Sequence, residues 1–333
     1  MIPGDQRRGF CTVAPRIGMD RGFPALSCGE RRVSFSGAVW YNSRECVPVC
    51  GGNPREQVRK RDGEDRGVIQ EVRVKTVEDL MPMISEQEYR PDLKRNRSSY
   101  LYRGMPNVSY RMVTSLSRCC KHLQKTLEPA ILDSFAKYAI REDPGVANSV
   151  WNRMITGQHN GLPTRLLDWS HSALVALHFA TTEENLADME DHDCMVWRID
   201  MQEQINHLPE KYRLAVGREQ TTLFSVDMLR KITDSLEQYD EDMGDHSMVI
   251  IEPPSTNPRI ETQYSFFSII PMGMEDIEKY LNEHTHRTVK YVIDRHLRWR
   301  VRDMLDQLNI SERLLYPGLD GLSKWIARHY YVK

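Results

Sequence analysis

The run of twelve residues at 158–169, Gln-His-Asn-Gly-Leu-Pro-Thr-Arg-Leu-Leu-Asp-Trp, constrains the fold of this chain more than any other segment. It separates two segments with apolar residues at helical spacing, 148–159 and 173–180. Gly161 is suited to end the first helix in a left-handed conformation, and Pro163 prevents that helix from continuing. The sequence therefore predicts two helices joined through a compact polar segment, with Ser170 as the N-cap of the second helix.

Two interpretations of residues 158–169 stay open at this point. In the first, the run is a loop whose polar side chains hold two helices onto a sheet, with Arg165 and Asp168 pairing three residues apart. In the second, it is one wall of a cleft in which His159, Thr164 and Arg165 face a ligand.

The rest of the chain from residue 67 mixes helical and extended patterns without a regular βαβ alternation, which favours the α+β class. The predicted strands are 71–75, 99–103, 194–199, 248–251, 259–270 and 289–293. The predicted helices are 127–141, 148–159, 170–180, 225–239, 274–282, 295–308 and 319–329, with a further helix start at Thr76. We expect a single mixed α+β domain over residues 67–333, with a small sheet and several packed helices.

The first 66 residues differ in composition from this domain. They are rich in glycine and arginine, basic side chains outnumber acidic ones, and their apolar residues show no sustained period. Such a segment buries too little surface to offset its chain entropy, so we expect residues 1–66 to be largely disordered, apart from a short strand around 32–41. A basic arm that touches a phosphate backbone is the functional alternative.

Charge and cysteine content narrow the protein class further. The formal net charge is −2 and no stretch of about 18 apolar residues occurs, so we expect no membrane span. The seven cysteines are odd in number and no secretory leader precedes them, which indicates reduced thiols in a cytoplasmic protein. Cys46, Cys50 and His122 lack a second pair at matching spacing, so no metal site is predicted.

Tyr102-Arg103-Gly104 closes a predicted strand. An arginine at this position can point its guanidinium into a cleft, where it would bind phosphate or pyrophosphate through two hydrogen bonds. Glycine allows another chain or a ligand to approach the backbone closely. The alternative is a surface arginine before a turn.

The segment Arg259-Ile-Glu-Thr-Gln263 forms a further polar cluster if it is extended. In a strand, Arg259, Glu261 and Gln263 share one face. That face either lines a polar pocket or is an exposed side of the sheet.

Five segments in this order resemble the FRG domain family, which is named for a Phe-Arg-Gly motif. They are 102–104, where tyrosine replaces the phenylalanine, the run 158–169, the apolar helix 174–180, the Arg-Ile-x-x-Gln segment 259–263, and Leu-Tyr-Pro-Gly-Leu-Asp-Gly-Leu at 315–322. The resemblance extends from Glu78 to His329 and leaves out residues 1–66. FRG domains occur in bacteria and their viruses.

The leading arginine of this family is similar to the NAD-binding arginine of ADP-ribosyltransferases, which implies a NAD-dependent enzyme in toxin action or antiviral defence. On that likeness NAD is the substrate, no metal is needed, and Arg103, Gly104, His159, Thr164 and Arg165 bind the dinucleotide. Arg103, Glu261 and Gln263 are the implied catalytic residues. Gln263 stands where those enzymes carry a glutamate, and Glu261 is the carboxylate that would replace it.

Two other functions stay open. One is a non-catalytic module that binds nucleotide, RNA or protein, supported by the basic N-terminal arm and the arginines at 295–302. The other is a different hydrolase, since Asp168, Ser170 and His171 cluster in sequence, although neighbouring residues rarely form a working relay. The acceptor, whether protein or nucleic acid, and any regulatory partner are not indicated by the sequence.

Overall fold

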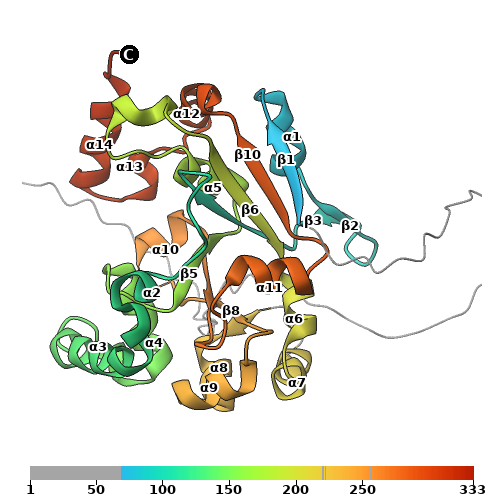
Figure 1. Ribbon diagram of the computed structural model, residues 1–333, viewed down its shortest axis with the longest axis vertical. Coiled ribbons are helices and arrows are strands. Elements are labelled where there is room, and N and C mark those ends of the chain that lie inside the picture. Colours follow the sequence, from blue (N-terminus) through green and yellow to red (C-terminus); the bar gives the residue numbers. More distant parts are fainter. Residues whose placement is uncertain (1–68, 220, 222, 256) are drawn as a thin grey trace, which may run out of the picture. The chain divides into compact units, whose positions relative to one another are not determined.

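The β-branched and aromatic residues of the chain gather in short strands that form one mixed sheet (Figure 1). The computed structural model describes residues 69–333 except 220, 222 and 256. Within these residues the sheet has eight strands in the order β1-β10-β6-β4-β5-β9-β8-β7. Their bounds are β1 Gln70–Val74, β4 Tyr100–Met105, β5 Leu166–Ser170, β6 Cys194–Asp200, β7 Phe224–Ser225, β8 Val249–Glu252, β9 Ser265–Ile269 and β10 Val289–Ile293.

Pairing within the sheet is antiparallel except at its two ends. β1 runs parallel to β10, and β7 runs parallel to β8. A separate two-stranded hairpin is formed by β2 (Glu88–Arg90) and β3 (Arg95–Arg97). The central strand β4 therefore lies between β6 and β5, where its residues are held from both sides.

Helices cover the sheet. They are α1 Met81–Ile84, α2 Ser115–Cys120, α3 Gln124–Ala139, α4 Val150–His159, α5 Ala173–Ala180, α6 Met201–His207, α7 Glu210–Glu219, α8 Val226–Ile232, α9 Leu236–Met243, α10 Pro258–Thr262, α11 Ile277–His284, α12 Arg298–Gln307, α13 Glu312–Leu315 and α14 Leu319–His329. Short 3₁₀ turns stand at 78–80, 121–123, 144–147, 186–190 and 295–297. None of these helices is both long enough and apolar enough to cross a bilayer.

Three apolar clusters fix these helices against the sheet. One packs α5 and α12 on β4, β6, β10 and β1. A second joins α11 to the inner residues of β4, β5 and β6, including the buried Trp197. The third surrounds β5, β8 and β9 with α4, α7, α8 and α9. The α+β class predicted from the sequence is confirmed, with one main sheet and helices on it.

Helix α5 approaches β4 unusually closely at Gly104. A Cβ atom built at this position would lie 1.9 Å from the carbonyl oxygen of Ala176 and 2.5 Å from the amide nitrogen of Ala180. Any side chain here would force the helix away from the strand. Glycine is therefore required at the position directly after Arg103.

Most predicted elements are confirmed, and β10 and α14 have the predicted bounds. The strand predicted over 259–270 is wrong in its first half. Asn257 accepts a hydrogen bond from the Arg259 amide as an N-cap and Pro258 occupies the first turn, so 258–262 is the helix α10 and only β9 is extended. Arg259, Glu261 and Gln263 consequently do not share a strand face.

Two other local predictions are also corrected. Ser172 and not Ser170 caps α5, because Ser170 belongs to β5. The helix predicted over 225–239 is two helices, α8 and α9, since Ser235 starts a new cap. The predicted boundary at residue 66, the disordered segment 1–66 and the strand at 32–41 lie outside the described residues.

Candidate functional site

A cavity of about 770 Å³ opens beside the carboxyl-terminal half of β4. It is lined by residues from remote parts of the chain: Tyr102, Arg103, Gly104, Pro106, Tyr110, Gln158, Asp168, Trp169, Ser170, Phe179, Thr182, Glu183, Glu184, Asn185, Asp188, Arg259, Gln263 and Ser265. The volume falls in the range of small-molecule sites. The three segments singled out in the sequence, around Arg103, within 158–169 and within 259–263, thus contribute to one cavity.

Arg103 is held at this cavity by the neighbouring strand β5. Its Nη1 donates a 2.7 Å hydrogen bond to the carbonyl oxygen of Asp168 and lies 3.8 Å from the carboxylate oxygen Oδ2. The side chain is only 18% exposed, and Nε is buried without a hydrogen-bond partner. Burial lowers the pKa of Arg103, and Asp168 opposes that shift. A guanidinium with an unsatisfied buried donor gains from an anionic ligand.

Asp168 is itself oriented by the end of α4. Gln158 donates through Nε2 to Asp168 Oδ2 at 2.9 Å, and Thr164 donates through Oγ1 to Gln158 Oε1 at 2.5 Å. Thr164 is buried and does not line the cavity. Thr164 instead fixes the side chain of Gln158, which in turn binds Asp168.

A second guanidinium lines the cavity from α10. Arg259 lies over the Tyr316 ring at 4.9 Å from its centroid, and its Nε is also buried without a partner. Gln263 is held differently, because its Nε2 donates to the Leu315 carbonyl at 2.9 Å while its own carbonyl accepts from Ser170 Oγ at 2.7 Å. The turn after α13 therefore positions both α10 side chains.

A carboxylate that the sequence analysis missed lines the cavity at Glu183, just after α5. Its Oε1 accepts from His192 Nε2 at 3.0 Å and from Arg298 Nη2 at 2.6 Å. Arg298 is fully buried, and the Glu183 side chain is 16% exposed. The sequence shows two adjacent acids, 183 and 184, shortly after an apolar helix, and that pattern alone does not distinguish a cavity carboxylate from a solvated one.

The structure does not bring every predicted site residue to the cavity. Glu261 is exposed on α10 and is absent from the cavity lining. His159 packs edge-on against Phe267, with ring centroids 5.2 Å apart, and burial lowers its pKa. Its Nε2 is buried without a partner, but the residue is not part of the lining.

Arg165 is buried in an ion network on the other side of β5. It donates two hydrogen bonds to Glu128 and one of 2.6 Å to Asp240. The pairing of Arg165 with Asp168 is therefore wrong, since these residues are an odd number of positions apart along extended chain and pair with different partners on opposite sides. Arg165 lines a smaller hollow of about 250 Å³ together with Thr114, Lys121 and Met272.

The residues of the two other candidate functions are engaged in structural contacts. Ser170 Oγ donates to Gln263, and the His171 ring lies 3.4 Å from the Ser98 carbonyl oxygen. Arg298 and Arg302 are buried in ion pairs with Glu183 and Glu312. Among residues 69–333 with their three gaps, no group of three or more His, Cys, Asp or Glu side chains is placed to hold a metal ion.

Comparison with known proteins gives one family. A family model of the FRG domain matches residues 98–189, the segment that supplies β4, α4, β5, α5 and the Glu183 turn. No curated protein and no solved structure matches the chain. The match contains the Tyr-Arg-Gly segment and the run 158–169, and most of the cavity lining lies within it. Residues 98–189 are therefore an FRG domain.

Proposed function

We propose that the cavity beside β4 binds a pyrophosphate-bearing dinucleotide, with NAD as the first candidate, and that the protein cleaves or transfers its ADP-ribose. The observation that carries this proposal is the pair of guanidiniums, Arg103 and Arg259, that line one cavity with unpartnered buried Nε atoms. Two such groups match the two charges of a pyrophosphate, since arginine binds phosphate oxygens in two-point fashion.

The aromatic part of the lining supports the same ligand class. Two aromatic lining residues, Tyr102 and Trp169, are packed into the core, whereas Phe179 is half-buried and Tyr110 is exposed. Flat rings of this kind stack with the base or nicotinamide of a dinucleotide.

Glu183 is the carboxylate that would act on the ribose. In NAD cleavage the bond between C1′ and the nicotinamide nitrogen breaks, its electron pair leaves with neutral nicotinamide, and positive charge develops on the ribosyl centre. A fixed carboxylate at the cavity stabilises that charge without reorganising. Attack by water at C1′ then gives ADP-ribose and a proton, whereas attack by an acceptor nucleophile gives the transferred product. His192 and Arg298 hold Glu183 in place for this role.

The experiment measures nicotinamide release from NAD by the full chain and by single variants. We expect Arg103→Ala and Glu183→Gln each to lower turnover by about 10²-fold or more, because each removes a charge at the reacting ligand. Glu261→Gln is the matched control. It changes the carboxylate implied by the family likeness, which lies outside the cavity lining, and should retain turnover.

Binding is measured in parallel by calorimetry with ADP-ribose. Loss of turnover with retained binding in Glu183→Gln supports the assignment of the carboxylate. Turnover abolished by Glu261→Gln and unaffected by Glu183→Gln would contradict it. Binding of ADP-ribose without turnover by the unmodified chain would instead make the protein a nucleotide-binding module. The neutral Gln263, which stands where a catalytic glutamate is expected, favours this alternative. A role in toxin action or antiviral defence stays a prediction from the resemblance.

A further inference from the structure

The β2–β3 hairpin carries an unusual concentration of basic side chains. Of its ten residues, 88–97, four are basic (Arg90, Lys94, Arg95 and Arg97) and two are acidic (Glu88 and Asp92). Both acids are already engaged, Glu88 by Arg287 and Asp92 by Arg90 at 3.3 Å. Lys94, Arg95 and Arg97 have no ion-pair partner within the part of the chain that the structure describes.

The register of the hairpin places like charges together. Arg90 stands directly opposite Arg95, and Arg97 stands opposite Glu88, so these four side chains share one face. Tyr89 and Asn96 are opposite one another on the second face. Like charges directly opposite across a strand pair cost free energy, which a bound polyanion would offset. Lys94 adds a further charge from the turn, where its φ is +50°.

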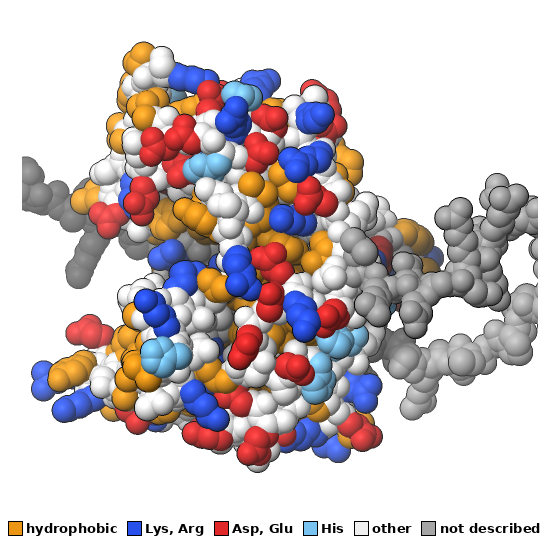
Figure 2. Space-filling model, in the orientation of Figure 1, with side chains coloured by type: hydrophobic (Ala, Val, Ile, Leu, Met, Phe, Trp, Pro, Cys, Tyr) orange, Lys and Arg blue, Asp and Glu red, His pale blue; other side chains and the backbone are white. Residues whose placement is uncertain are grey.

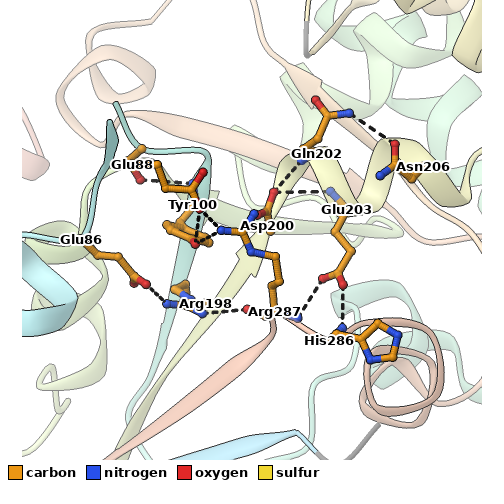
Figure 3. A network of polar contacts seen from close by, with 11 residues as sticks. Glu86, Glu88, Tyr100, Arg198, Asp200, Gln202, Glu203, Asn206, His286 and Arg287 are labelled. Atoms are coloured by element: carbon orange, nitrogen blue, oxygen red, sulfur yellow. Dashed lines mark hydrogen bonds and ion pairs between the residues drawn. The ribbon is translucent and has the colours of Figure 1, made fainter. Parts of the chain in front are cut away.

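The hairpin is fixed at its base by a polar network on the sheet (Figure 3). Arg198 binds Glu86 on the approach to β2, and Arg287 binds Glu88 and the Tyr100 hydroxyl. Arg287 also lies 2.5 Å from the buried Asp200, and the Arg198 guanidinium lies over the Tyr100 ring at 4.3 Å. These contacts use β6, β4 and the turn before β10, so the basic strands project from a rigid support (Figure 1).

The face of the molecule seen in Figure 2 shows no broad basic field. Acidic and basic side chains are interspersed over the face of the molecule seen in Figure 2. Over the chain as a whole, acidic side chains outnumber basic ones, 47 to 45. A local arm is therefore the part of the described structure best suited to a polyanion.

We propose that the β2–β3 hairpin binds the phosphate backbone of a nucleic acid, independently of the cavity beside β4. A two-stranded ribbon fits a nucleic-acid groove, and exposed arginines and lysines neutralise backbone phosphates. Tyr89, 61% exposed, offers a ring on which an unpaired base stacks. A protein partner fits less well, since a protein interface needs a contiguous apolar centre and the hairpin exposes only Tyr89 and Leu93 as large hydrophobics.

The test measures fluorescence anisotropy of labelled single-stranded RNA, single-stranded DNA and duplex DNA with the full chain between about 50 and 200 mM salt. The variant is Lys94→Gln/Arg95→Gln/Arg97→Gln. We expect at least one of the three nucleic acids to bind roughly tenfold or more weakly to this variant. The slope of log K against log salt should fall by about 2 to 3, because each lost phosphate contact contributes about 0.7 to 0.9.

The matched control removes the same charge from exposed residues of α3 and of the turn after it, as Lys125→Gln/Lys137→Gln/Arg141→Gln. It should bind like the unmodified chain. Arg95→Lys/Arg97→Lys should also keep the affinity, since backbone contacts need charge and not a particular base edge, and this variant keeps the test valid if the triple variant is misfolded. Equal losses in hairpin and α3 variants, an unchanged hairpin variant, or tighter binding to polyglutamate than to any nucleic acid would overturn the proposal.

Discussion

Single residues at this site have roles that their chemistry alone does not reveal. Gly104 follows Arg103, and a ligand-binding role was predicted for it. It lines the cavity, but its lack of a side chain is required by the backbone of α5, which comes within 1.9 Å of where a Cβ would be. The Tyr-Arg-Gly segment thus combines one residue that presents a charge with one that lets a helix close over the strand.

We predict that Gly104→Ala lowers the free energy of unfolding by about 3 kcal/mol or more, since the methyl group overlaps backbone atoms that cannot rotate away. Denaturant melts measure this change. Gly217→Ala is the control, because nothing lies within 4 Å of a Cβ there and the residue is exposed in α7. That substitution should stabilise the chain by about 0.5 to 1 kcal/mol. If Gly104→Ala left the free energy of unfolding unchanged, α5 would be shown to shift freely.

At the scale of elements, the C-terminal helices α12, α13 and α14 are joined by a buried network of ion pairs. Glu312 on α13 receives hydrogen bonds from Arg328 on α14 and Arg302 on α12. Burial opposes ionisation of this carboxyl, but the hydrogen bonds from Arg328 and the charge of Arg302 outweigh it and lower its pKa to about 2. The adjoining turn supplies Tyr316 and the Leu315 carbonyl to Arg259 and Gln263.

The lowered pKa of Glu312 predicts a pH dependence. A carboxyl whose pKa is about 2 when folded and 4.5 when unfolded stabilises the fold above pH 4.5, and this stabilisation is lost as the pH falls toward 2. The difference in unfolding free energy between the unmodified chain and Glu312→Gln should therefore shrink by about 3 kcal/mol from pH 5 to pH 2. Chemical denaturation at each pH measures it. A difference that is constant with pH would contradict this account.

Sequence patterns located elements well where local signals agreed with packing. The alternating residues 194–199 lie in β6, and the segment 319–329 forms α14 as predicted. The prediction was wrong at 259–262, where the Asn257-Pro258 start outweighed the polar alternation. The strand β5 at 166–170 is not predicted by either interpretation of 158–169, because four of its five residues are buried and they show no period of two.

The candidate site was only partly predictable for a similar reason. Arg103 and the segment around Asp168 could be selected because their residue types suit a polar cleft. Glu183 could not, since its importance depends on Arg298, which is 115 residues away in sequence and fully buried. Long-range ion pairs of this kind leave no local pattern.

At the scale of the molecule, the cavity joins strands and helices from residue 102 to residue 265. A ligand bound there would bridge these elements and stabilise the fold as a whole. At about 100 times its dissociation constant, ADP-ribose should add about 2.7 kcal/mol, which corresponds to a rise of roughly 5–10 °C in Tm.

Thermal melts with and without ADP-ribose measure this effect. Arg103→Ala and Arg259→Ala should each abolish most of the rise, because each removes a cavity guanidinium. Arg111→Ala is the control, since Arg111 is exposed and pairs with Asp276 away from the cavity. A rise that survives both cavity substitutions would place the ligand elsewhere.

The tight contact at Gly104 also limits how this cavity can respond to an occupant. Because β4 and α5 are in close contact, Arg103 and Phe179 keep fixed positions relative to one another. This part of the cavity is therefore rigid. Any adjustment to the size of a bound molecule must therefore come from other lining residues, such as those of the turn at 182–185 and Tyr110. Selectivity for the length of a ligand would then depend on these residues, whereas Arg103, beside the fixed contact at Gly104, would set a preference for negative charge.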